Sequence, residues 1–154
     1  TFGPRQSERA VIPTIIRQIL DNSCKVIKLG SLSPVRDFNY VSNTVDAFLE
    51  LATSNEATQG EVYNTGSGIG VTIGQVVNML MDICGIAKPV EIDNHRKRPA
   101  KSEVFELIAD PQKLIKASAW TSSVCLKTGL EKTVDWWTAS PKGLNSESGA
   151  TYKI

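Results

Sequence analysis

Apolar residues recur at helical spacing near the start of the chain and predict its first helix. The spacing of these residues is typical of an amphipathic helix that buries one face. We expect this helix to span residues 7–22, with the Ser7 side chain as its N-cap. Pro13 lies inside the span and should either kink the helix or mark its true first turn. The apolar positions are Val11, Ile12, Ile15, Ile16, Ile19 and Leu20.

Short segments between the helices predict strands. Residues 25–29 form one, ended by Gly30, and residues 35–41 form another. Alternation along the second strand places Arg36, Phe38 and Tyr40 on one face. Further extended segments are expected at residues 61–65, 71–73, 89–92 and 104–109.

Four more helices follow from apolar periodicity and from helix start and stop residues. Ser42 or Asn43 should cap the first of these, and Thr72 should precede the second, which Gly85 ends. Asp110 should cap the third, with Pro111 at its first position. The predicted spans end near Ala52, Cys84, Ala117 and Ala139.

Helices and strands alternate irregularly, without the run of βαβ units that a complete parallel sheet needs. We therefore expect one α/β or α+β domain over residues 1–140, followed by a flexible polar tail at residues 141–154.

Composition excludes several classes of function. Hydrophobic residues make up 41% of the 154 residues and charged residues 21%, which is typical of a soluble globular protein. A net charge of +1 argues against a nucleic-acid partner, and the short apolar runs argue against a membrane span. We expect no secretion signal, and three widely spaced cysteines favour a reducing, cytoplasmic location. A single histidine and no Cys-x-x-Cys make a metal site improbable.

Two cationic positions are candidates for anion binding. Arg36 could bind a diphosphate through its planar guanidinium, or it could form an ordinary surface ion pair with Asp37. The run His95-Arg96-Lys97-Arg98-Pro99 could attract the same anion or could be a solvated charged loop. The glycines of residues 66–70 lack the spacing of a dinucleotide fingerprint, so we interpret them as a turn after a strand.

Several short motifs, taken in order, resemble the C-terminal half of NAD-dependent nucleotide-sugar epimerases and dehydratases, which are extended short-chain dehydrogenases. The motifs are Phe2-Gly3-Pro4-Arg5-Gln6, Arg9 to Pro13, Leu29-Gly30, Arg36-Asp37-Phe38-Asn39-Tyr40-Val41, Gly60-Glu61-Val62-Tyr63-Asn64-Thr65-Gly66, and Arg98-Pro99 with Lys101-Ser102-Glu103. The resemblance implies the substrate domain of that fold without its N-terminal Rossmann domain. It also implies NAD(P) for the full-length proteins but no cofactor in this chain alone.

The resemblance assigns roles to individual residues. It implies that Arg36 and Arg98 bind the diphosphate of a nucleotide sugar and that Arg9 lies close to the substrate. It further implies that the base of the nucleotide lies near Ile27, Lys28 and Leu29. The family's catalytic Tyr-x-x-x-Lys pair is absent, because none of the tyrosines Tyr40, Tyr63 and Tyr152 has a lysine four residues later. The family usually has Asp where this chain has Asn43, so a salt link made by that Asp would be lost.

Apolar residues that the family's Rossmann sheet would cover form a possible interface here. They are Val62 and the helical stripe of Val45, Phe48, Leu49 and Ala52. We expect a homodimer through this surface, unless the last helix with Trp136 and Trp137, or the tail, covers it. Three hypotheses result: a domain that binds a nucleotide sugar or nucleoside diphosphate without catalysing a reaction alone, a non-enzymatic self-associating module, and one half of a split enzyme with a separate Rossmann-domain chain.

Overall fold

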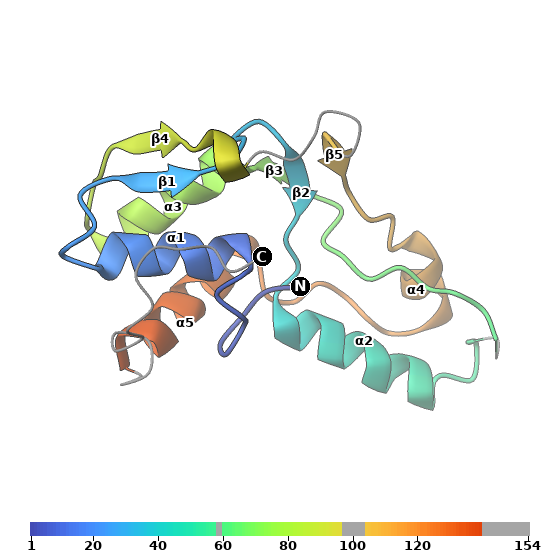
Figure 1. Ribbon diagram of the computed structural model, residues 1–154. Helices are drawn as coiled ribbons and strands as arrows, with labels where there is room; N and C mark the ends of the chain where they lie inside the picture. The colour runs from blue at the N-terminus through green and yellow to red at the C-terminus, as the bar shows by residue number, and fades with distance from the viewer. Residues whose placement is uncertain (58–59, 97–103, 140–154) are drawn as a thin grey trace.

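The described part of the chain forms five α-helices, two small sheets and one 3-10 turn (Figure 1). It comprises residues 1–57, 60–96 and 104–139 of this computed structural model. The mixed α/β class predicted from the sequence is therefore confirmed. Within the same residues, no helix is both long enough and apolar enough to cross a membrane.

The main hydrophobic core lies between a two-stranded parallel sheet and three helices. Strand β1 pairs in parallel with β4, and helices α1 and α3 pack against each other and against α5. The amide of Gln18 on α1 bonds to both backbone groups of Lys28, so it satisfies the edge of β1 that β4 leaves free. The elements are α1 (Val11–Leu20), β1 (Ile27–Leu29), α3 (Ile73–Cys84), β4 (Val90–Ile92) and α5 (Leu126–Ala139).

A second, three-stranded sheet carries the residues that later form the candidate site. Its central strand, β2 (Val35–Asp37), pairs antiparallel with β3 (Gly70–Thr72) and parallel with β5 (Glu106–Leu107). The 3-10 turn η1 (Asn94–Arg96) follows β4. This sheet is mixed, so it is not the parallel sheet of a complete doubly wound fold.

A smaller core joins α2 (Val41–Thr53) to α4 (Gln112–Ala117). Ala47, Leu114 and Trp120 are buried there, and the partly buried Leu51 and Tyr63 pack against them. In Figure 1 these two helices lie together, apart from the group formed by α1, α3 and α5.

Three predicted helix starts were wrong. Helix α4 begins at Gln112, and its N-cap is Pro111 rather than Asp110, although Asp110 Oδ1 accepts from the Gln112 N–H. Helix α1 begins at Val11 rather than at residue 7, and Pro13 lies in its first turn, as one of the two sequence alternatives proposed. The Ser7 hydroxyl accepts a hydrogen bond from the Arg9 N–H instead of capping the helix. Helix α2 begins at Val41, so Asn43 lies inside its first turn and is fully buried rather than acting as a cap.

The predicted strand at residues 61–65 does not form. The side chain of Lys113 holds this segment against α4 instead. Its Nζ donates to Glu61 Oε2 at 2.7 Å and to the Val62 carbonyl at 2.9 Å, and it lies 4.7 Å from the centre of the Tyr63 ring. The segment is therefore fixed by side-chain contacts rather than by a strand partner.

Candidate functional site: a pocket beside Arg36

An open pocket of about 430 Å³ lies beside the central strand of the mixed sheet. Its volume is within the range of small-molecule sites. Strand β2 provides two of its lining residues, the end of β5 and the loop after it provide four, and the segment before the Gly66 turn provides three. The lining residues are Thr1, Arg36, Asp37, Asn39, Tyr63, Asn64, Thr65, Leu107, Ile108, Ala109 and Asp110.

Arg36 supplies the positive charge of the pocket wall. It is half-buried on β2, opposite Leu107 of β5 in the strand register. Its Nη1 donates to the carbonyl of Val35 at 2.7 Å. A guanidinium is a suitable group for an anion, because its planar fork can bind two oxygens side by side.

The carboxylate of Asp37, which lines the pocket, fixes the glycine-rich turn. It accepts hydrogen bonds from the Ser67 N–H at 3.0 Å, the Ser67 hydroxyl at 2.6 Å and the Gly68 N–H at 2.9 Å. The N–H of Ala109 lies 3.4 Å from its second oxygen. A carboxylate with this many donors has little capacity left, so Asp37 is a structural group rather than an exposed negative charge.

Close packing explains why a glycine begins this turn. A Cβ at Gly66 would lie 2.4 Å from the Cβ of Ala109 and 2.6 Å from Asp37 Oδ2. Any side chain there would separate the turn from Asp37 and from the loop after β5. Gly68 has a φ of +73°, a conformation that favours glycine.

Buried amides support the floor of the pocket. Asn39 is 4% exposed, and its Nδ2 lies 3.1 Å from Thr44 Oγ1 and 3.3 Å from Thr65 Oγ1. Its Oδ1 accepts a hydrogen bond from Asn43 Nδ2 at 3.1 Å. The first residues join the same region, because Phe2 forms an isolated parallel bridge with Tyr40. The pocket therefore rests on a side-chain network that connects β2, α2 and the N-terminal segment.

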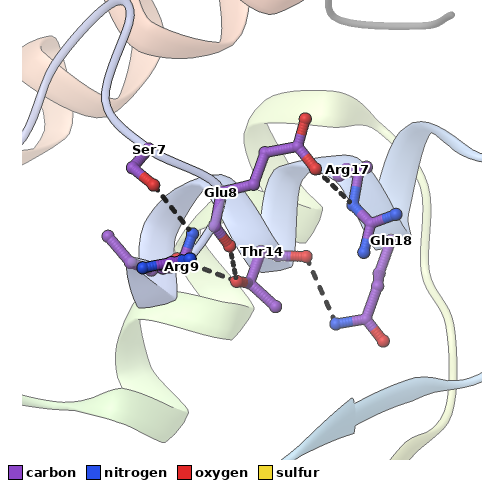
Figure 2. Close-up of polar contacts among 7 residues, drawn as sticks. Ser7, Glu8, Arg9, Thr14, Arg17 and Gln18 are labelled. Atoms are coloured by element: carbon purple, nitrogen blue, oxygen red, sulfur yellow. Dashed lines mark hydrogen bonds and ion pairs between the residues drawn. The ribbon is translucent and has the colours of Figure 1, made fainter. Parts of the chain in front are cut away.

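Arg9, which the resemblance places beside Arg36 and Arg98 at the substrate, lies outside the pocket. Its side chain is exposed in the segment before α1. Figure 2 shows how that segment is tied to the helix: Thr14 Oγ1 lies 2.7 Å from the Glu8 carbonyl, and Glu8 Oε2 lies 3.4 Å from Arg17 Nε. The structure does not bring Arg9 and Arg36 into one pocket.

The other predicted site residues have different placements. Ile27 and Leu29 are buried in the main core, at 0% and 4% exposure, so Lys28 is the residue of β1 whose side chain is free to reach a ligand. Arg98 lies outside the described residues. Asp37 and Asn39 also line the pocket and belong to the motif that identified Arg36, but they were not predicted as site residues.

The glycine turn of residues 66–70 does not fit the phosphates of a dinucleotide cofactor. The N–H groups of Ser67 and Gly68, which could have bound a phosphate, already donate to Asp37. Strand β3, which follows this turn, runs antiparallel to β2, whereas a dinucleotide turn belongs to a parallel βαβ unit. In the part of the chain that the structure describes, no group of three or more His, Cys, Asp or Glu side chains could hold a metal ion.

Comparisons with known proteins identify the family. The GDP-mannose 4,6 dehydratase family model matches residues 1–133. "Putative GDP-L-fucose synthase 2" of Arabidopsis thaliana is 28% identical over 140 residues, which cover 88% of this chain and 40% of that protein. The mouse dTDP-D-glucose 4,6-dehydratase is 27% identical over 141 residues, or 88% of this chain and 38% of that protein. The chain thus spans about two fifths of the length of these curated relatives.

Solved structures give the same result. A UDP-glucuronic acid 4-epimerase from Bacillus cereus, in complex with UDP-glucuronic acid and NAD, superposes with a TM-score of 0.78 at 25% identity. The match covers 88% of this chain and 41% of that one. The chain belongs to the GDP-mannose 4,6 dehydratase family and has the fold of part of an extended short-chain dehydrogenase, as its motifs predicted.

Proposed function

We propose that this chain binds a nucleoside diphosphate or nucleotide sugar and that Arg36 contacts the diphosphate. The observation that carries the proposal is a half-buried guanidinium in the wall of a pocket of about 430 Å³. Burial strengthens the attraction between such a cation and a phosphate, because less water screens the two charges.

The two carboxylates beside Arg36 do not oppose an anionic ligand as strongly as their charges suggest. Asp37 is surrounded by donors from the glycine turn, and Asp110 Oδ1 accepts a hydrogen bond from the Gln112 N–H at 3.0 Å. Each negative charge is thereby partly compensated by local N–H dipoles. Among the described residues that line the pocket, Arg36 is the one with a cationic side chain.

The relatives support the class of ligand. The Bacillus cereus epimerase was solved with UDP-glucuronic acid, and a Thermotoga maritima UDP-glucose 4-epimerase, 30% identical to this chain, was solved with UDP-glucose. We infer that Arg98 adds further contacts to the phosphates or the sugar, and that Arg9, which lies outside the pocket, contacts a part of the ligand that extends beyond it. Lys28 lies on β1. The family resemblance implies that this strand passes near the base of the nucleotide.

We propose that residues 1–154 bind this ligand without turning it over alone. Hydride transfer requires a nicotinamide held against the sugar, and the Tyr-x-x-x-Lys pair is absent from this sequence. The cofactor-binding and catalytic groups would come from sequence outside these residues, in a longer chain or in a separate Rossmann-domain polypeptide.

A thermal-shift panel tests the proposal. UDP, GDP, dTDP and their sugar derivatives are each added to the purified chain, and at least one should raise Tm by mass action. The increase should disappear in Arg36→Ala and persist in Arg5→Ala. The same ligands with NAD(P) should produce no absorbance change at about 340 nm, the band of the reduced nicotinamide. No increase in Tm with any ligand, or turnover by the chain alone, would contradict the proposal.

A further inference from the structure

Two buried amides connect the backbone of Val124 to the pocket beside Arg36. Asn43 Oδ1 accepts from the Val124 N–H at 3.0 Å, and Asn43 Nδ2 donates to the Val124 carbonyl at 2.9 Å. A backbone N–H can only donate and a backbone carbonyl can only accept. The two ends of the Asn43 amide therefore cannot be exchanged, and Nδ2 is the atom that it presents to Asn39, at 3.1 Å.

The orientation of Asn43 fixes that of Asn39. Asn39 Oδ1 accepts from Asn43 Nδ2, and exchanging the two ends of the Asn39 amide would place two N–H donors against each other. Both residues are buried, so a lost bond would leave a polar group unpaired. Asn39 Nδ2 is therefore held as the donor to two hydroxyls, Thr44 Oγ1 at 3.1 Å and Thr65 Oγ1 at 3.3 Å.

Thr65 is the member of this network that has an unused donor at the pocket. It is half-buried and lines the pocket together with Arg36. A hydroxyl has one hydrogen to donate, and because Thr65 Oγ1 accepts from Asn39, that hydrogen is directed elsewhere. Among the residues that the structure describes, none accepts it, whereas Thr44 Oγ1 lies 3.1 Å from a second hydroxyl, Thr1 Oγ1. The Thr65 hydroxyl can therefore donate to an atom that enters the pocket.

We propose that the Thr65 hydroxyl donates a hydrogen bond to a phosphate oxygen of the ligand bound beside Arg36. Asn43, acting through Asn39, is the positioning residue that makes Thr65 a donor. The inference rests on the proposed function of the pocket. Phosphate is the ligand group that fits, because its ionised oxygens accept hydrogen bonds and are attracted by the Arg36 cation. A sugar hydroxyl both donates and accepts, so it does not require a wall of fixed polarity.

Titration calorimetry with UDP, GDP and dTDP tests the contact. Thr65→Val keeps the shape of the side chain but removes the hydroxyl. It should weaken the binding of each diphosphate that the wild type binds by about 10-fold, the scale of a hydrogen bond to a charged group. Thr65→Ser keeps the hydroxyl and should recover most of the lost affinity. Thr44→Val is the matched control, because it removes the other hydroxyl bonded to Asn39 but none that lines the pocket, so its effect should be smaller.

The outcomes separate this inference from the proposed function. If the wild type binds these diphosphates and Arg36→Ala weakens binding while Thr65→Val does not, the hydroxyl contact is wrong and the anion site stands. Equal losses in Thr65→Val and Thr44→Val would show that the hydroxyl acts only through the packing of Asn39, which also overturns the contact. An effect of Thr65→Val with one base alone would overturn the assignment to phosphate. No binding by the wild type would overturn both proposals.

A double-mutant cycle tests the role of Asn43. At about pH 8, above the usual Asp pKa of about 3.9, the ionised side chain of Asn43→Asp cannot donate to Asn39. Asn39 would then turn its Nδ2 toward position 43 and its Oδ1 toward Thr65, whose hydroxyl would donate to Asn39 instead of to the ligand. Asn43→Asp should therefore weaken diphosphate binding in the wild-type background and have no further effect in the Thr65→Val background. Additive effects of the two substitutions, or unchanged binding by an Asn43→Asp variant that circular dichroism shows to be folded, would overturn the positioning role.

Discussion

At the residue scale, the amide of Asn43 joins helix α2 to the segment before α5. Its Nδ2 lies within hydrogen-bond distance of Ser122 Oγ at 3.0 Å and the Val124 carbonyl at 2.9 Å, and its Oδ1 accepts from the Val124 N–H at 3.0 Å. Its own carbonyl accepts from Trp120 Nε1 at 2.7 Å. One fully buried residue thus connects the two hydrophobic cores.

Asn43→Ala should lower the free energy of unfolding by about 2–4 kcal/mol, because it leaves several buried groups without their partner. Urea denaturation followed by tryptophan fluorescence measures this change. Asn22→Ala is the matched control, since Asn22 is exposed and its backbone carbonyl, which the substitution keeps, accepts from Lys25 Nζ. Equal stabilities of the two variants would contradict the role assigned to the buried amide.

The exposed thiol of Cys125 should be more reactive than an ordinary cysteine. The hydrogen bond between the Cys125 thiol and the Thr128 hydroxyl, followed by one with the Thr128 backbone N–H, lowers the pKa of Cys125. Burial instead raises the pKa of Cys84. The thiolate of Cys125 should therefore persist to lower pH, and the thiolate is the reactive form.

Alkylation with iodoacetamide, resolved by peptide mass spectrometry between pH 6 and 10, checks this expectation. The pH at which the alkylation rate of Cys125 is half-maximal should lie below the usual thiol pKa of about 8.5. Thr128→Ala should raise this pH. Thr138→Ala, at the other end of the same helix, should leave it unchanged. A Cys125 midpoint at or above that of Cys84 would refute the assignment.

At the scale of elements, the sequence predicted most accurately those helices whose ends are determined by neighbouring residues. Helix α3 has the predicted bounds, because its start and its end depend on neighbouring residues. Thr72 and Gln75 form a reciprocal capping box, and Gly85 closes the helix with a φ of +64°.

Thr72→Ala should therefore cost about 1 kcal/mol of stability, measured by urea denaturation. Thr53→Ala, in the last turn of α2, should cost less; an equal cost would contradict the capping role.

Elements that depend on distant partners were harder to predict. Residues 61–65 have a strand pattern but no strand partner among the described residues, and Lys113 holds them from a helix that lies about fifty positions later. The residues of the candidate site show the same difference between local and distant determinants. The motif around Arg36 pointed to an anion site, whereas the bonds of Asp37 to Ser67 and Ala109 span 30 and 72 positions. Sequence periodicity has no information about such pairs.

At the scale of the whole molecule, the chain spans about 40% of the length of relatives such as the Arabidopsis protein. The carboxylate of Asp37 accepts hydrogen bonds from the N–H groups of the glycine turn. The pocket beside Arg36 is nevertheless framed by two strands, the residues before the glycine turn and the N-terminus. The central claim is that this framework binds a nucleoside diphosphate through Arg36.

Titration calorimetry with the nucleoside diphosphate that gives the largest thermal shift tests this claim most directly. Arg36→Ala should weaken binding by about 1.5–3 kcal/mol, roughly 10- to 150-fold, the scale of a charge-assisted hydrogen bond. Arg98→Ala should have a similar effect and Arg5→Ala a smaller one. Far-UV circular dichroism should confirm that each variant is folded. Equal affinities of the wild type and a folded Arg36→Ala variant would contradict the account.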